Sequence, residues 1–330
     1  MKKISISISV VILAVFTATS TISAKDAAKL RIVRTIAITP EGEYYQNPKI
    51  SPDGSKVVFR GQEGGLFIRN ADGTGPMITV LPRGKEVRDY IWSPDSKMIA
   101  YQRSRIEGGK RWIDIMIFKT ANKETDVLKK KIPPFGFTYW TSGGIKVKRG
   151  LPHQKSKERE SVKAMNKIID VSSKEFKKSN EPIVYYDQID LKHFVIVEDG
   201  NGNVLSKTPG YILPLMSPTK DKFLAVRQHT YVLSLFGEIL ADLGVAENRI
   251  WSKDGQLILF QIVEYGGWHN QVIVGSELCV INVDGSGKNH LTDTPDIIEM
   301  YPHWSDDTSK ITYYDDKTHR IYVSELEYIR

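Results

Sequence analysis

The stretch Asn47–Phe59, "NPKISPDGSKVVF", decides the fold, and at its centre is the tetrad Ser51-Pro52-Asp53-Gly54. Proline, aspartate and glycine are typical of a tight turn, because each favours a backbone conformation or a local hydrogen bond that turns need. An aspartate here could equally be a metal ligand or a catalytic base. The rest of the sequence separates the two interpretations, since an acid needed for chemistry is expected once, whereas a turn recurs in a repeated fold.

Five further segments resemble this stretch. Three are close, "WSPDSKMIAY" from Trp92, "WSKDGQLILF" from Trp251 and "WSDDTSKITY" from Trp304, and two are weaker, "WTSGGIKVKR" from Trp140 and "MSPTKDKFLAV" from Met216. The six copies begin at Ser51, Ser93, Thr141, Ser217, Ser252 and Ser305, with spacings of 42, 48, 76, 35 and 53 residues. The recurrence favours a turn role for the aspartates and a core role, not a ligand cage, for the tryptophans.

Strands flank each turn. In the four good copies an apolar residue lies six positions after the serine and an aromatic residue eight positions after it, as in a strand with one buried face. Third strands are expected at 65–73, 113–120, 193–200, 230–237, 277–285 and 320–326, and short fourth strands at 77–81, 238–243 and 288–292. Four strands joined by tight turns, repeated at about 40 residues, are the signature of β-propeller blades.

The two ends of the repeat array complement each other. The last unit ends with its third strand, whereas residues 30–39, "LRIVRTIAIT", form a predicted strand before the first unit. A propeller closes when a strand from one terminus completes the blade of the other. The sequence therefore predicts an all-β, six-bladed β-propeller that is closed by residues 30–39.

One interval is too long for a single blade. Its surplus coincides with residues 150–181, a charged segment in which Val162, Met165, Ile168 and Ile169 lie at helical spacing. We expect a helical insertion in blade three, after which the chain returns to the ring. The alternative is a seventh, poorly marked blade at 167–209.

The motif Trp-Ser-Pro-Asp-Gly, followed by the two strand patterns and by Leu-Thr, resembles the WD40-like repeats of the TolB-type propellers. The segment "ELCVINVDGSGKNHLTDTPDIIEMYPHWSDDTSKITYYDD", residues 277–316, matches over a full period. The resemblance covers residues 44–145 and 193–326. It implies a propeller fold and an accessory role in envelope assembly or transport, although the same repeats occur in regulatory domains of peptidases and in some lyases. TolB itself carries an additional N-terminal α/β domain, which we do not expect here.

The first 24 residues have the layout of a secretory signal peptide, with Lys2 and Lys3 before an apolar run and small residues up to Ala24. We expect cleavage there, a propeller domain over residues 25–330 and a periplasmic or secreted protein. No later segment approaches 18 consecutive apolar residues, so we expect no membrane span after cleavage.

Composition limits the partners. Cys279 is the only cysteine, so an intrachain disulfide is excluded. It lies in an alternating apolar run, which predicts a buried, inert thiol. The formal net charge of +7 falls to +5 without Lys2 and Lys3, a bias towards anionic partners such as envelope polymers that is too weak to indicate nucleic acid. We expect a monomer that binds a protein or an anionic polymer.

The candidate binding surface is the face opposite the repeated turns. The connections after second strands vary most in length and sequence, at 103–112, 150–181 and 263–271, and function on rigid scaffolds concentrates in variable loops. Its candidate binding residues are Arg105, Lys110, Arg111, Tyr265, Trp268 and His269.

Catalytic motifs are scarce. The sequence has no G-x-S-x-G motif, and its seven histidines are scattered without ligand spacing. We therefore expect no catalytic residues and no cofactor, and a role as a binding scaffold. The alternative is a metal-dependent propeller enzyme such as a polysaccharide lyase, in which His229, His269 and His303 from different blades would hold a divalent metal.

Overall fold

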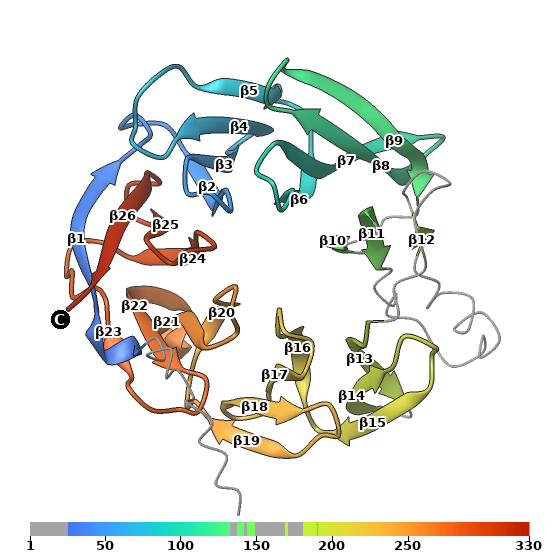
Figure 1. The fold of residues 1–330 in the computed structure, drawn as a ribbon. Helices are drawn as coiled ribbons and strands as arrows, with labels where there is room; N and C mark the ends of the chain where they lie inside the picture. The colour runs from blue at the N-terminus through green and yellow to red at the C-terminus, as the bar shows by residue number, and fades with distance from the viewer. Residues whose placement is uncertain are drawn as a thin grey trace, which may run out of the picture.

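The computed structural model describes residues 26–132, 137–141, 144–148, 169–170, 181–189 and 191–329. These residues form seven antiparallel sheets arranged in a ring, each with its first strand nearest the central axis (Figure 1). Two 3-10 helices, η1 (Ala27–Lys29) and η2 (Trp268–Asn270), accompany the strands. Within the described ranges, no helix is long and apolar enough to cross a membrane.

The sheets are numbered here as blades 1 to 7 along the chain. Blade 1 contains β2 (Tyr45–Ile50), β3 (Lys56–Gly61), β4 (Gly64–Asn70) and β5 (Ile78–Leu81); blade 2 contains β6 (Val87–Trp92), β7 (Met98–Glu107), β8 (Lys110–Lys119) and β9 (Glu124–Ile132). Blade 3 contains β10 (Phe137–Thr141), β11 (Gly144–Lys148) and β12 (Ile169–Asp170); blade 4 contains β13 (Ile183–Ile189), β14 (Lys192–Glu198) and β15 (Val204–Pro209). Blade 5 contains β16 (Ile212–Met216), β17 (Lys222–Val226), β18 (Thr230–Ser234) and β19 (Ile239–Asp242); blade 6 contains β20 (Glu247–Trp251), β21 (Leu257–Gly266), β22 (Val272–Asn282) and β23 (Asn289–His290). Blade 7 contains β24 (Glu299–Trp304), β25 (Lys310–Asp315), β26 (Ile321–Tyr328) and β1 (Leu30–Ala37).

The ring closes as the sequence predicts. Strand β1 pairs antiparallel with β26, from Leu30 opposite Tyr328 to Ala37 opposite Tyr322. It supplies the outermost strand of blade 7 and covers the edge that β26 would otherwise expose.

The seven sheets differ from the six blades predicted and agree with the seven-blade alternative. The cause lies in blade 4, where β13 turns directly into β14, so that Ile189 stands opposite Lys192. These strands therefore form their own meander with β15 and do not complete the third unit.

The predicted helical insertion, residues 150–181, lies outside the described residues apart from Ile169, Asp170 and Glu181. Ile169 was assigned to the helical pattern, but it is extended in β12 and pairs with Val147 of β11. For this residue the helical prediction is wrong, because a ladder partner in β11 is available to it.

The repeated tetrads make the turns that their sequence predicts. The hydroxyl of Ser93 donates a hydrogen bond to Asp95 over 2.6 Å and accepts one from the Met98 amide over 2.9 Å. Ser93 and the amide of Lys97 hold the pKa of Asp95 below its ordinary value. The same serine–aspartate bond, also 2.6 Å long, recurs between Ser51 and Asp53, Ser252 and Asp254, and Ser305 and Asp307.

The periodic tryptophans join neighbouring blades. The indole nitrogen of Trp92 donates to the Lys49 carbonyl of blade 1, that of Trp251 to Leu215 of blade 5, and that of Trp304 to Trp251 of blade 6, over 2.8, 3.1 and 2.9 Å. All three rings are buried. The core role predicted for these three is confirmed, whereas the side chain of Trp140 lies outside the described part of the chain.

The hydrophobic core lies between adjacent sheets. One cluster joins Val58 and Leu66 of blade 1 to Trp92 and Tyr101 of blade 2, and comparable clusters fill the other described junctions. Cys279 belongs to the cluster between blades 5 and 6, and burial raises the pKa of its thiol to about 11. The predicted burial of this thiol is confirmed.

Candidate binding face

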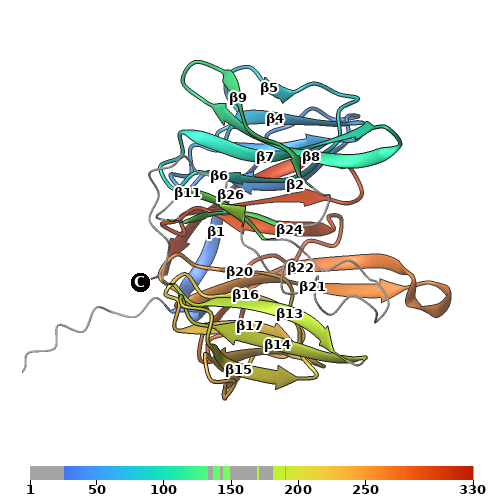
Figure 2. The ribbon, with the colours of Figure 1, turned by 90° about the vertical axis from the view of Figure 1, so that its right-hand side faces the viewer.

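The turns between second and third strands all lie on one face of the disc, because strand direction alternates within each blade. Two hairpins on this face, β7–β8 and β21–β22, have strands of 10 or 11 residues, whereas β3 and β4 have 6 and 7. Both extend beyond the disc on the same side, the right-hand side of Figure 2. This surface is called the hairpin face below.

The β21–β22 hairpin ends in exposed apolar side chains. Trp268 is 86% exposed, and its ring lies 4.3 Å from that of His269. Tyr265 is 45% exposed and donates its hydroxyl to Glu247, while Val272 and Val274 are exposed nearby. These four apolar residues, Tyr265, Trp268, Val272 and Val274, are called the hairpin tip.

Arg105 on the β7–β8 hairpin belongs to an ion-pair cluster within its own blade. Its Nε atom lies 3.0 Å from Asp114, which also pairs with Arg103 over 2.9 Å. Asp114 is 1% exposed; burial opposes its ionisation, but the two guanidinium groups still hold its pKa below the ordinary value. Arg105 also contacts Glu107, so its charge is neutralised locally.

The other two binding residues predicted on the β7–β8 hairpin differ in their ion pairing. Arg111 donates to both oxygens of Glu86, over 2.5 and 2.6 Å. Lys110 is exposed and has no ion pair within the described part of the chain. Because blades 2 and 6 are separated by blades 7 and 1, the six predicted residues form two groups on the hairpin face, not one patch (Figure 1).

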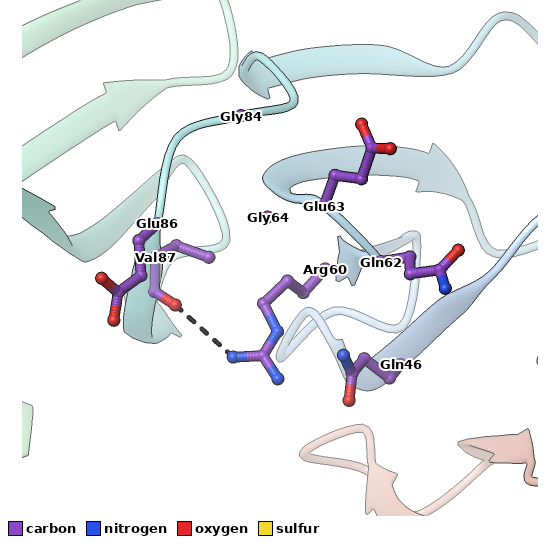
Figure 3. A pocket seen from close by; sticks show the side chains of 8 residues that line it. All are labelled: Gln46, Arg60, Gln62, Glu63, Gly64, Gly84, Glu86 and Val87. Atoms are coloured by element: carbon purple, nitrogen blue, oxygen red, sulfur yellow. Dashed lines mark hydrogen bonds between the residues drawn. The ribbon is translucent and has the colours of Figure 1, made fainter.

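A pocket of about 330 Å³ lies between blades 1 and 2, and none of the residues lining it was predicted. It is bounded by the β3–β4 turn and by the connection from β5 to β6, with Arg60 and Gln46 on its inner side (Figure 3). We call it the Arg60 pocket. A sequence signal for it did exist, because Arg60 stands at the repeat position occupied by Gln102 in blade 2 and by Gln261 in blade 6.

A pair of carboxyl groups inside blades 6 and 7 was also missed. Glu299 is fully buried and accepts a hydrogen bond from the Thr294 hydroxyl, while the Thr294 amide donates to Glu277 over 3.2 Å. Burial raises the pKa of Glu299 to about 7, and Glu277 contributes to the rise. Each carboxyl has one buried oxygen with no hydrogen-bond partner in the structure.

The three histidines considered for a metal have different neighbours. His229 pairs with Asp242 over 3.0 Å, His269 contacts Trp268 at the end of its hairpin, and His303 has a buried Nδ1 atom. Among the described residues, no group of three or more His, Cys, Asp or Glu side chains is arranged to hold a metal ion.

Comparisons with known proteins inform the fold. No protein-family model and no curated protein matches the sequence. Among solved structures, the chain is similar to the β-propeller domain of Cps50 (Swd1) from Myceliophteria thermophila, with a TM-score of 0.53 and 9% identity over 90% of this chain and 99% of that one. A chain of the Mitotic Checkpoint Complex gives 0.52 and 11% over 99% of both chains. A putative TolB from Agrobacterium tumefaciens gives 0.49 and 14% over 91% of this chain and 97% of that one.

These identities are low, so the likeness concerns the fold and not the activity. The ring of antiparallel sheets and the closure by β1 are features of the same architecture. The sheet topology and the two solved structures with TM-scores above 0.5 together show that the chain has a β-propeller fold.

Proposed function

We propose that this propeller is an exported, non-catalytic scaffold that binds a protein of the cell envelope through its hairpin face, in envelope assembly or transport. The observation that carries the proposal is the hairpin tip. Its tryptophan is 86% exposed at the end of a hairpin that projects beyond the disc (Figure 2). Exposed aromatic and arginine side chains of this kind supply much of the binding energy at protein interfaces.

The contacts around the hairpin tip support a preformed binding element. A Cβ atom added at Gly266 would lie 2.7 Å from Val274, so the two strands approach closely where β21 ends. The pairing continues from Val263 opposite Ser276 to Gly266 opposite Val272. The tip therefore binds with little loss of backbone entropy, because the ladder already orders it. One chain with a similar fold belongs to an assembly of proteins, the Mitotic Checkpoint Complex. By analogy of fold, a protein partner is consistent with this architecture.

A crosslinking experiment tests this proposal. A photo-reactive amino acid replaces Trp268 in the full chain, which is then illuminated in cells of its source. The control carries the same group at Phe236, which is 70% exposed in the β18–β19 turn on the opposite face. We expect a discrete protein adduct from position 268 that is absent from position 236.

Other outcomes have defined meanings. Identical adducts from the two positions, or none from position 268, would contradict a binding role for the hairpin face. A ladder of adducts that is removed by glycan-degrading enzymes would replace the protein partner by an envelope polymer. Competition by unmodified wild-type protein, but not by Trp268→Ala, shows that the adduct reports a specific site.

A further inference from the structure

The walls of the Arg60 pocket are fixed by backbone contacts. The amide of Gly65 donates to the Lys85 carbonyl, and the amide of Gly84 donates to the Glu63 carbonyl, each over 2.9 Å. Gly64 has a φ of +79°, and a Cβ atom there would lie 2.3 Å from the Lys85 carbonyl oxygen. Only glycine allows the β3–β4 turn to approach the β5–β6 connection this closely. The pocket is therefore present before any ligand binds.

Arg60 stands in this pocket with most of its donors unused. Its one hydrogen bond joins Nη1 to the Val87 carbonyl over 3.5 Å, the outer limit for such a bond. The nearby arginines are already neutralised, Arg83 by Glu43 and Arg111 by Glu86. Among the described residues, no carboxylate lies within ion-pair distance of Arg60. A guanidinium group has five N–H donors, so several remain for a ligand.

The repeat argues against a purely structural role for Arg60. At the same position of blade 6, Gln261 accepts a hydrogen bond from the Tyr301 amide of blade 7 over 2.9 Å. Tyr301 has a φ of 53° in an irregular part of the innermost strand, which this bond holds. A guanidinium group has no acceptor and cannot make the equivalent bond. Arg60 of blade 1 therefore has a different role from Gln261 of blade 6.

The surroundings restrict the ligand. Figure 3 shows the Arg60 guanidinium between Val87 and the Gln46 carboxamide, with the Glu63 side chain directed away from it. Glu86 lines the same pocket and is occupied by Arg111. Among the residues that line the pocket, Arg60 is the one cation and Glu63 and Glu86 are acids, so the lining suits a monoanion better than a phosphate dianion. A planar guanidinium matches a carboxylate in two parallel hydrogen bonds.

We infer that the Arg60 pocket binds the carboxylate of an acidic side chain of a protein partner, through Arg60 with the carboxamide of Gln46 beside it (Figure 3). The inference rests on the proposed protein-binding function and adds the chemistry that the partner must present. The pocket opens on the hairpin face, so one partner can contact it together with a hairpin.

The inference is tested by titrating two blocked tripeptides into the full chain, Ac-Ala-Glu-Ala-NH2 and its neutral analogue Ac-Ala-Gln-Ala-NH2, with binding followed by NMR. We expect millimolar binding of the glutamate peptide and at least about tenfold weaker binding by Arg60→Gln, since a charge-assisted pair is lost. The variant carries the residue that blades 2 and 6 have at this position, and its melting temperature verifies the fold. Arg60→Lys, which keeps the charge but loses the planar fork, is expected to bind at an intermediate level.

Equal binding of the two peptides, no binding of either, or unchanged binding by Arg60→Gln would overturn the inference. Competition by inorganic phosphate at lower concentration than by the glutamate peptide would do the same, because it assigns the pocket to a dianion. Phe236→Ala, in the exposed β18–β19 turn on the opposite face, is the matched control and binds the peptides normally. Failed titration with successful crosslinking rejects only the pocket, and the reverse result rejects only the hairpin face.

Discussion

Glu299 shows how a single residue departs from the repeat. Six positions before the turn serine, the other blades that can be aligned carry Tyr45, Val87, Tyr211 and Ala246, all buried. Blade 7 has a carboxyl group there, fully buried beside Thr294 and Glu277. A buried carboxyl of this kind favours its protonated form, because burial penalises the charge.

The raised pKa makes a prediction about stability. The pKa of Glu299 is about 7 in the folded chain against an ordinary 4.5, so the folded state binds the proton more tightly. Its contribution is therefore most favourable at low pH and decreases as the pH rises from about 4.5 to about 7. Over that pH range, ionisation of Glu299 is expected to lower the free energy of unfolding by an amount on the order of 3 kcal/mol, and Glu299→Gln is expected to remove this dependence.

Urea unfolding of the wild type and of Glu299→Gln at pH 5 and pH 8 provides the measurement. The difference between the two proteins cancels the contribution of all other titrating groups. The variant should gain stability relative to the wild type at pH 8. If the two proteins differ in unfolding free energy by the same amount at pH 5 and at pH 8, Glu299 is ionised in the fold at both pH values, which contradicts the prediction.

A second residue-scale prediction concerns the turns. Ser252 is fully buried, and its hydroxyl accepts the amide hydrogen of Leu257 and donates to Asp254. Ser252→Ala leaves the buried Leu257 amide without that partner and should cost about 1–3 kcal/mol. Ser286→Ala, in an exposed turn where the hydroxyl contacts Asp284, is the control and should change little. Thermal unfolding of both variants measures the contrast, and equal losses would contradict the role of the buried hydroxyl.

At the scale of elements, tryptophans in different positions have opposite roles. Trp304 on β24 is buried and donates to blade 6, whereas Trp268 on η2 is exposed. Trp304→Ala is expected to cost about 3–5 kcal/mol of folding free energy, and Trp268→Ala less than about 0.5 kcal/mol. Chemical denaturation tests both values. A large loss for Trp268→Ala would mean that the tip is part of the fold and not a binding element.

The elements also show how far the sequence could predict the candidate site. Strand alternation and turn chemistry are local, so they located the β21–β22 connection and its exposed Trp268. The ion pair of Arg105 with Asp114 could not be predicted, because it depends on the register that places Asp114 opposite Arg103 on the adjacent strand, and register is not visible in a list of residues. The walls of the Arg60 pocket depend on the packing of a turn against an interblade connection, which the sequence does not reveal; only the replacement of the repeated glutamine by Arg60 could have indicated the site.

At the scale of the whole molecule, the architecture followed from periodicity. The propeller and its closure by residues 30–39 could be predicted because each blade repeats the same turn and buried positions. The blade number could not, because blade 4 has no serine–aspartate turn and β13 joins β14 through a different connection. A blade that lacks the marker residues is invisible to a search for them.

The predicted export signal, residues 1–24, lies outside the described residues and is tested on the mature protein. N-terminal sequencing of the protein from the periplasmic or secreted fraction should begin at Lys25, after the small residue Ala24. An intact Met1 in that fraction would show that the segment is retained.

The pairing of β1 with β26 also has a consequence for biosynthesis. During translation β1 emerges among the first residues of the domain, yet its partner, Ile321–Tyr328, is among the last. The ring cannot become complete until nearly the whole chain is available, and contacts so distant in sequence form slowly. Strand β1 therefore waits without its partner during synthesis, and it docks only after the strands of the carboxyl-terminal blade have been made.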